Sequence, residues 1–167
     1  MRPPTAALRL YKATIDDGPF LLAIRNLDDV RSQSKTKDVI DEETHRKWLQ
    51  VHLGSPESVI WIIEMEREQL GYVRAQQSKK ESPSGEWLLS IALKPFFRGQ
   101  GLGTWAVHEA CRLLHENFRA EYVVAEVLRW NAAALNLFKP CGFRMTAIVQ
   151  QDGQDMQRLE LALSGRL

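Results

Sequence analysis

Residues 86–103 read EWLLSIALKPFFRGQGLG, and this stretch decides the fold. Its first part, Glu86 to Leu93, is almost continuously apolar, which is typical of a central strand covered on both faces. The glycine-rich run RGQGLG at 98–103 then opens a segment with apolar residues at helical spacing as far as about Asn117. The pattern predicts a buried strand, a glycine-rich turn and a helix.

The flanking segments predict a mixed layout of strands and helices. Strands are expected at 8–13, 59–65, 70–77, 122–128, 143–149 and 156–163, helices at 15–26, 41–54 and 132–138, and a loop at 78–85. The order β-α-α-β-β-β-α-β-α-β-β predicts an α/β fold of mixed layers, with one mixed sheet and helices on both faces. The strands that flank the glycine-rich helix should be parallel.

Composition narrows the class of protein. The chain has 167 residues, 44% of them apolar and 26% charged, and shows no repeat or linker, so a single domain over 1–167 is expected. Its 22 basic and 21 acidic residues give a net charge of +1, which argues against a nucleic-acid or membrane partner. The sequence does not fix the oligomeric state, and a homodimer is one of the states it allows.

Short apolar runs and sparse cysteines predict the compartment. The apolar run 59–63 is far shorter than a membrane span, and no signal-like segment follows Met1. Cys111 and Cys141 do not form a CxxC pair, so free thiols, no metal site and a cytoplasmic location are expected.

The glycine-rich turn predicts an anion site. Free N–H groups and the positive helix end would meet at this turn, Gly101 and Gly103 would let an oxygen approach the backbone, and Arg98 would add a charged donor. The spacing is neither a Walker A loop nor a Rossmann fingerprint. Taken alone, the motif fits a tight turn without a ligand equally well.

A second motif follows the next strand: Asn131-Ala-Ala-Ala-Leu135, then Phe138 and Cys141-Gly142-Phe143. Asn131 is expected to cap a short helix that runs through Phe138. Together with Pro95 to Gly103, it resembles the acetyl-CoA binding core of the GNAT superfamily of N-acetyltransferases, over about residues 86–145. The surrounding order of elements is also similar to the GNAT fold from Leu8 onward.

The resemblance implies acetyl-CoA as co-substrate, with no metal. It assigns the pyrophosphate to Arg98, Gly99, Gln100, Gly101, Leu102, Gly103 and Thr104, the pantetheine arm to Ile91, Ala92 and Leu93, and the cofactor's path to Asn131 and Phe138. If strands 86–93 and 122–128 splay apart, unpaired backbone groups are left for the pantetheine amides, and an N–H near Ala92 or Leu93 would stabilise the thioester oxyanion.

Three side chains are candidates for proton transfer. Glu86 opens the central strand, where some GNAT members place a catalytic glutamate; the alternative is a carboxylate in solvent. Ser90 would relay a proton, or is simply packed in the strand. His45 shares a helix face with His52 and would face the acceptor pocket, with a solvated or core-edge position as the alternative.

The chain departs from the family at one position. GNAT members commonly have a tyrosine, proposed as general acid for the departing thiolate, where this sequence has Phe138. Cys141 or water would have to substitute, although a buried, apolar role is the simpler interpretation of Cys141. A non-catalytic acetyl-CoA-binding module is therefore an alternative function.

The N-terminal third predicts the acceptor. Arg25-Asn26, Arg31 and residues 41–49 (DEETHRKWL) resemble a GNAT branch that acetylates nucleotide-linked amino sugars, including enzymes of the pseudaminic acid pathway, and overlap with ribosomal-protein N-terminal acetyltransferases. The basic residues Arg25, Arg31, Lys35 and Lys37 suit a diphosphate-bearing substrate, or form an ordinary solvated loop. The predicted function is direct acetyl transfer to a primary amine of a small molecule; the alternative acceptor is a peptide N-terminus.

Overall fold

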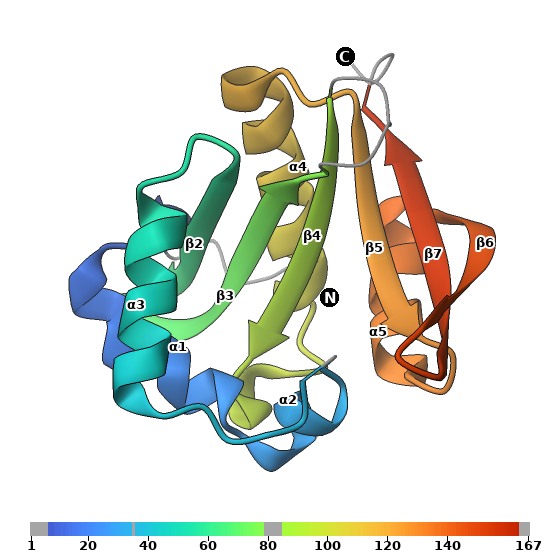
Figure 1. Ribbon diagram of the computed structural model, residues 1–167. Helices are drawn as coiled ribbons and strands as arrows, with labels where there is room; N and C mark the ends of the chain where they lie inside the picture. Colours follow the sequence, from blue (N-terminus) through green and yellow to red (C-terminus); the bar gives the residue numbers. More distant parts are fainter. Residues whose placement is uncertain (1–6, 35, 79–84, 164–167) are drawn as a thin grey trace.

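The computed structural model describes residues 7–34, 36–78 and 85–163, and these residues build a seven-stranded sheet (Figure 1). Its order is β1-β2-β3-β4-β5-β7-β6. The strands are β1 (Leu8–Lys12), β2 (Ser58–Met65), β3 (Glu68–Gln77), β4 (Glu86–Leu93), β5 (Tyr122–Leu128), β6 (Arg144–Gln151) and β7 (Gln154–Ala162). Neighbouring strands are antiparallel except for β4 and β5, which are parallel as predicted.

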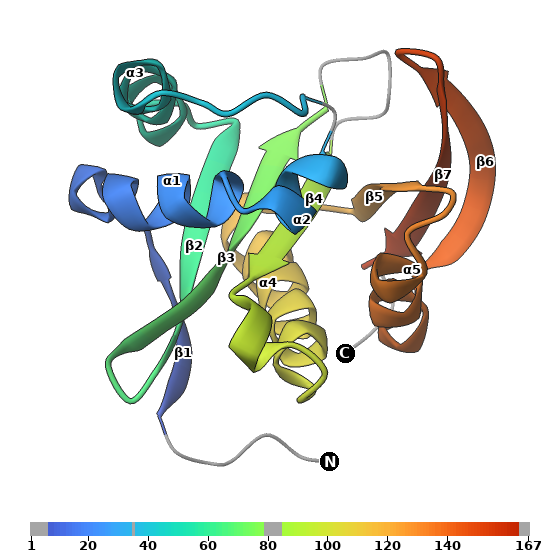
Figure 2. The same ribbon diagram turned by 90° about the horizontal axis from the view of Figure 1, so that it is seen from below.

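Helices cover both faces of the sheet, which confirms the predicted mixed α/β architecture (Figure 2). On one face lie α1 (Gly18–Arg25), α2 (Asp28–Ser32) and α3 (Glu42–Leu53), and on the other α4 (Leu102–Phe118) and α5 (Ala132–Phe138). The larger apolar core lies under α4, and a smaller one lies between α1, α3 and β2.

The short helix α2 was not predicted. The sequence interpretation ended one helix near Asn26 and began the next at Asp41. Asp28 and Asp29 open α2, where carboxylates favour the positive end of a helix, and the Asp29 side chain accepts a hydrogen bond from the Val30 N–H. Of the predicted loop at 78–85, residues 79–84 lie outside the described residues.

Strand β4 is covered on both faces only in its first half. Trp87 and Leu89 pack into the core under α4, and Glu86 is also buried. From Ser90 onward the strand is exposed or half-buried. The prediction of a strand buried throughout is therefore wrong for residues 90–93, because β4 leaves its neighbour β5 before it ends.

The separation of β4 from β5 confirms the predicted splay. Their residues pair only from Glu86 with Tyr122 to Leu88 with Val124, after which the strands diverge (Figure 1). This leaves a gap in the middle of the sheet, beside the turn that leads into α4.

Candidate active site

The edge of β4 that faces the gap has free backbone groups. Glu86 and Lys94 both bond to β3 or the turns that flank it. Because alternate residues of an antiparallel strand bond to the same neighbour, the even-numbered residues of β4 direct their N–H and C=O groups to β3. Ile91 and Leu93 therefore face the gap, whereas Ala92 does not. This corrects the expectation that the Ala92 N–H is available to the cofactor.

The turn before α4 has the geometry expected of an anion site. Gly99 and Gly101 adopt the left-handed region, with φ of 72° and 80°, where a side chain would be strained. Within the described part of the chain, no acceptor bonds to the N–H groups of residues 99–104. The 17-residue helix α4 adds the positive end of its dipole.

Arg98 binds protein groups in this structure, and its expected role as a charged donor at the anion site stays a prediction. Its Nε and Nη2 donate to the Leu93 carbonyl oxygen at 3.0 and 2.8 Å, and its Nη1 pairs with Asp29 of α2. The hydrogen bond from Arg98 lowers the pKa of the Asp29 carboxyl below its ordinary value. Arg98 thus ties the end of β4 to α2, and its donors are engaged by the protein itself.

Gly103 lies where side chains of α5 and β4 approach the start of α4 closely. A Cβ at this position would lie 2.8 Å from Leu137 Cδ1 and 3.4 Å from Leu93 Cδ1. At 2.8 Å the two carbons are too close, so the end of the Leu137 side chain would have to shift. The glycine therefore lets the first turn of α4 pack closely against α5.

The second motif forms the start and end of α5. The Asn131 side chain caps this helix by accepting a hydrogen bond from the Ala134 N–H at 3.1 Å, as predicted. Phe138 is only 3% exposed and packs edge-on against Phe143. Its ring therefore lies in the core, and its place along the cofactor's path remains a prediction.

Cys141 is buried, as its simpler interpretation predicted. It is 1% exposed, and its Sγ lies 3.3 Å from the Leu137 carbonyl oxygen. Burial raises the pKa of the Cys141 thiol to about 11. A thiol that is neither accessible nor ionised at neutral pH is a poor nucleophile and a poor acid for the departing thiolate.

Glu86 lies at the far end of β4 from the glycine turn. It is 8% exposed and accepts a hydrogen bond from Arg158 Nη2 at 2.7 Å, so the alternative of a carboxylate in solvent is wrong. At a strand rise of roughly 3.3 Å per residue, Glu86 is about 23 Å along the strand from Leu93. Its role as base stays a prediction.

Glu126 is a carboxylate that the sequence interpretation missed. It follows Val124, the last residue of β5 that pairs with β4, and it is half-buried. Val123, Ala125 and Val127 face the α4 core, so the Glu126 side chain is on the opposite face, which also carries Ser90. The signal available in the sequence was a lone acid inside an otherwise apolar strand.

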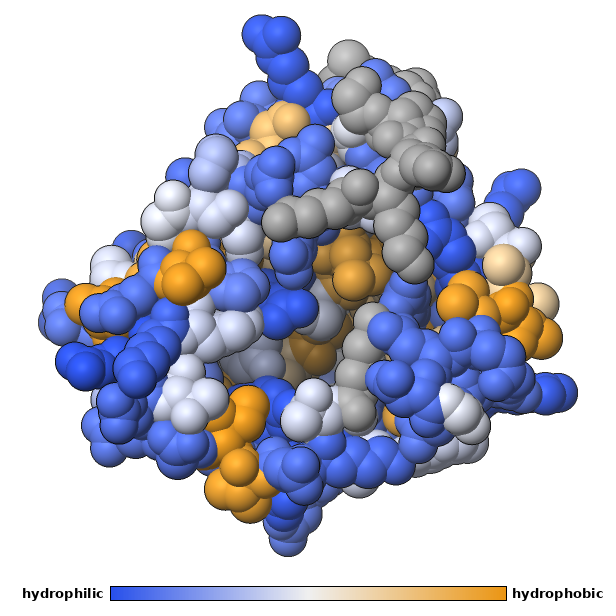
Figure 3. Space-filling view, in the orientation of Figure 1, coloured by the Kyte–Doolittle hydropathy of each residue, from blue (hydrophilic) through white to orange (hydrophobic). Residues whose placement is uncertain are grey.

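Ser90 and His45 lie on the same side of the sheet. Ser90 is exposed on β4, opposite Arg74 of β3, and His45 is buried in α3. Burial, and next to it the charge of Arg25, lower the pKa of His45. His45 is therefore neutral at pH 7 and can accept a proton. Figure 3 shows that this face of the molecule is hollowed between α3 and β5, with hydrophilic and hydrophobic residues around the hollow.

Some of the basic side chains expected at the acceptor site are bound by other groups of the protein. Arg31 pairs with Asp28 and donates to the carbonyl oxygens of Asn26 and Lys37, so its role is to hold the loop. Arg25 donates to the Thr36 carbonyl oxygen at 2.7 Å, and Lys37 is exposed. Lys35 lies outside the described residues.

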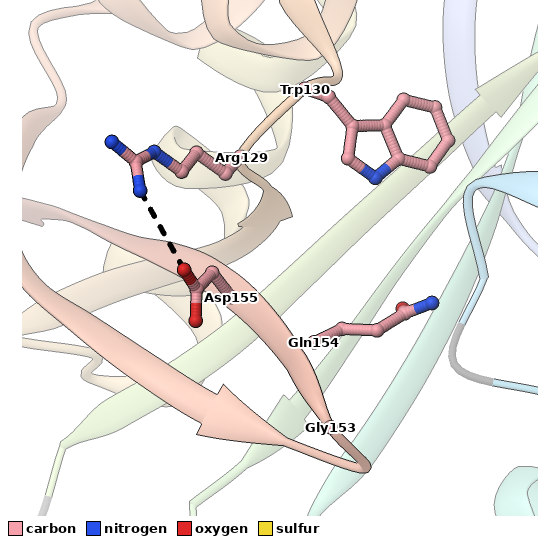
Figure 4. Close-up of a pocket in the computed structure, with 5 residues that line it drawn as sticks. All are labelled: Arg129, Trp130, Gly153, Gln154 and Asp155. Atoms are coloured by element: carbon pink, nitrogen blue, oxygen red, sulfur yellow. Dashed lines mark ion pairs between the residues drawn. The ribbon is translucent and has the colours of Figure 1, made fainter.

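A pocket of about 530 Å³ lies at the end of β5 and the β6–β7 turn (Figure 4). Arg129 and Asp155 form an ion pair across it at 3.6 Å. Trp130 and Gln154 point away from this pair (Figure 4). The Trp130 side chain, 57% exposed, directly precedes the α5 cap. No residue of β4 or of the glycine turn lines this pocket, so it is distinct from the gap between β4 and β5.

The described residues contain neither a candidate metal cluster nor a candidate membrane-spanning helix. No group of three or more His, Cys, Asp or Glu residues among them could hold a metal ion. None of their helices has both the length and the apolar character that crossing a membrane requires.

The sheet order, the splayed β4–β5 pair and the glycine turn at the start of α4 together define the class of acetyltransferases with the GNAT architecture. A family model described as acetyltransferase (GNAT) domain matches residues 7–144. The chain belongs to this family and is an acyltransferase.

Curated relatives are similar over much of the chain. An N-alpha-acetyltransferase of Sulfurisphaera tokodaii is 28% identical over 62% of this chain and 69% of its own length. The catalytic subunit of the N-terminal acetyltransferase A complex of Arabidopsis thaliana is 26% identical over 94% of this chain and 79% of its own.

Solved structures share the fold. Spermidine N-acetyltransferase from Vibrio cholerae, in complex with CoA and spermine, superimposes with a TM-score of 0.83 at 16% identity and covers 94% of this chain and 96% of its own. Ribosomal-protein-alanine N-acetyltransferase from Brucella melitensis gives a TM-score of 0.79 at 23% identity, covering 93% and 100%.

Proposed function

We propose that this protein transfers an acetyl group from acetyl-CoA directly to a primary amine, within a ternary complex of enzyme and both substrates. The observation that carries the proposal is the gap between β4 and β5, with its free backbone groups, beside a glycine turn whose N–H groups have no acceptor among the described residues. A backbone edge and an anion site suit a linear, amide-containing cofactor with a pyrophosphate.

The backbone supplies the binding groups. The N–H groups of residues 99–104 hold the pyrophosphate, and the gap-facing backbone groups of Ile91 pair with the amides of the pantetheine arm. Acetyl-CoA brings the activated thioester. The Leu93 N–H is aimed at the thioester oxygen and stabilises the negative charge that develops there, a contribution worth about 10²–10³ in rate in other acyl transfers.

The amine arrives from the face that carries Ser90 and His45. Its nitrogen bonds to the acetyl carbon, the carbon–sulfur bond breaks, and the amine loses one proton, so the products are an amide and the thiol of coenzyme A. An amine with a pKa near 8 is partly neutral at cellular pH, which favours N- over O-acetylation. The thiol, with a pKa near 8.5, leaves with little proton donation, so the lack of a hydroxyl at Phe138 is tolerated.

Glu126 is the better-placed base. Glu86 is aligned with Tyr122 of the parallel strand β5. Glu126 lies four residues after Tyr122 along β5, so it is roughly 13 Å closer than Glu86 to the reacting end of the gap. His45 and Ser90 remain candidates for passing the proton on. Replacing Glu126 with Gln should lower kcat about 100-fold or more. The same change at Glu86 should mainly lower stability, because Arg158 loses this partner.

Two acceptor classes have support. The half-buried Arg25 and Arg31, which the sequence places near the acceptor, favour a nucleotide-linked amino sugar, whose diphosphate they would bind. The N-alpha-acetyltransferases among the relatives favour the α-amino group of a protein. A panel of UDP-amino sugars, peptides and polyamines, assayed by thiol release from acetyl-CoA, separates them.

The kinetic test uses initial rates at varied concentrations of both substrates. Intersecting lines in double-reciprocal plots support a ternary complex, whereas parallel lines with acetylated Cys141 contradict it. Calorimetry with coenzyme A should show binding. Tight binding without turnover of any acceptor would leave the non-catalytic binding module as the function.

A further inference from the structure

Arg25 and Arg74 lie on the side of the sheet that carries Ser90 and His45, and they lack the carboxylate partner that other arginines have. Arg74 is half-buried in the middle of β3 and alternates with Val73 and Ala75, which face the α4 core, so its side chain is on the side of α1 and α3. Its guanidinium lies 5.4 Å from the centre of the Trp48 ring of α3. Arg25 ends α1, and its Nη1 is buried without a hydrogen-bond partner within the described part of the chain.

The contrast with the remaining arginines is clear among the described residues. Six of them form ion pairs with Asp or Glu: Arg9, Arg31, Arg98, Arg112, Arg129 and Arg158. Others without an ion pair, such as Arg46 and Arg144, are exposed to water. In the described part of the chain, Arg25 and Arg74 form no ion pair and are not exposed. Burying a charge without an opposite charge is unfavourable.

The two arginines lie on elements that pack together, because α1, which ends at Arg25, contacts β3, which carries Arg74. Burial lowers the pKa of Arg74, and the charge of Arg25 adds to this effect. Arg25 also lowers the pKa of His45, which is therefore neutral and contributes no positive charge at pH 7. Tyr72, two residues from Arg74, has a pKa raised by burial and is neutral too. Two positive charges thus lie in partly desolvated positions on neighbouring elements, and an anion would relieve their unfavourable burial.

We propose that Arg25 and Arg74 form a subsite that binds an anionic group of the amine acceptor, either a phosphate or a carboxylate. The inference rests on the proposed N-acetyltransferase function and adds a charge requirement to its acceptor. Guanidinium groups bind both anions through paired N–H donors. The same subsite disfavours polyamines, because two arginines repel a polycation.

The subsite also sets the spacing within the acceptor. Arg74 is directly opposite Ser90 in the β3–β4 register. Ser90 lies three residues before Leu93, which is roughly 10 Å along the strand. In the proposed complex, the Leu93 N–H faces the thioester oxygen. The anion and the amine of the acceptor should therefore be separated by several bonds.

The first experiment measures the preference for anionic acceptors. Two matched pairs are compared by kcat/KM: glucosamine with glucosamine 6-phosphate, and hexylamine with 6-aminohexanoate. The first pair reports on phosphate and the second on carboxylate. In at least one pair, the wild type should favour the anionic member by about tenfold or more, as expected for hydrogen bonds to a charged group.

Variants assign this preference to the arginines. R74Q and R25Q should lose the preference and still acetylate the neutral member, whereas R9Q, which changes an arginine of the remote strand β1, should keep it. R74K tests the same position with the charge retained and should keep part of the preference. An equal preference in the wild type and R74Q would overturn the proposal.

A binding readout separates this inference from the proposed function. The protein is first saturated with coenzyme A, so that the glycine turn is occupied, and its thermal stability is then measured with inorganic phosphate or acetate against chloride at equal ionic strength. Phosphate or acetate should raise the Tm of the wild type and of R9Q more than that of R74Q. Equal shifts would overturn the subsite even if acetyl transfer is confirmed. A larger Tm shift in the wild type than in R74Q would support the subsite, whether or not any of the four amines is acetylated. Failure to acetylate any of them would count against the proposed function instead.

Discussion

The close approach of β3 and β4 at Gly71 gives the sharpest prediction. A Cβ at this position would lie 2.3 Å from the Ala92 carbonyl oxygen and 2.9 Å from Leu93 Cα. Both are backbone atoms, so no rotamer change relieves the contact, and β4 must move by about 1 Å. Overpacking of this kind costs about 3 kcal/mol. For a chain of this size, that loss lowers Tm by about 6–12 °C.

The same displacement should reduce activity. Leu93 is the register partner of Gly71, and a misplacement of about 1 Å at a reacting centre costs about 100-fold in rate. We therefore expect Gly71→Ala to lose both Tm and kcat/KM, measured by thermal unfolding and by thiol release from acetyl-CoA. Gly18→Ala is the control, because its Cβ would meet only Leu49 Cδ2 at 3.4 Å. A Gly71→Ala protein with the stability and kcat/KM of the control would refute the reasoning.

Three other changes test separate parts of the site. Gly101→Val places a β-branched residue at a φ of 80° and should abolish the rise in Tm that coenzyme A produces; an unchanged shift would argue against the phosphate turn. Cys141→Ala should retain kcat within about threefold, because a buried thiol with a pKa of about 11 takes no part in direct transfer; loss of turnover by a folded protein would point to an acyl-enzyme. The pKa of the Asp29 carboxyl is lower in the folded than in the unfolded protein. Its contribution to the free energy of unfolding is therefore present above about pH 4 and is lost as the pH falls through the folded-state pKa. The difference in unfolding free energy between the wild type and Asp29→Asn should be below about 1 kcal/mol, constant from pH 8 to 5, and smaller below pH 4; a difference that grows in acid would contradict the Arg98 pair.

Hydrophobic patterns in the sequence predict most of the fold, because the strands that matter are buried. The predicted bounds Glu86–Leu93 and Tyr122–Leu128 agree with β4 and β5, and the Asn131 cap is observed. The helix α2 was missed because its five residues carry no helical apolar period and depend on local carboxylates.

The backbone part of the site was more predictable than its side chains. The run RGQGLG predicts a turn at which the backbone can approach an anion, and Gly99 and Gly101 are found there in the left-handed region. The partner of Arg98 depends on where α2 packs, which local sequence does not encode. The sequence carries no signal that singles out Arg74, because its contact with Trp48 depends on how α3 packs on the sheet.

The end of β4 is held from three directions, and this explains how a backbone N–H can act as a catalytic group. The Lys94 N–H bonds to the Leu70 carbonyl oxygen at 2.8 Å, Gly71 admits the strand at close range, and Arg98 binds the Leu93 carbonyl oxygen. The Leu93 N–H belongs to the preceding peptide, which it shares with the Ala92 carbonyl. Because that carbonyl is directed to β3 in the strand pairing, this peptide plane also has little freedom to turn the N–H away from the gap. A donor that is already oriented before the charge develops costs no reorganisation during the reaction, which is the condition under which such a group accelerates acyl transfer.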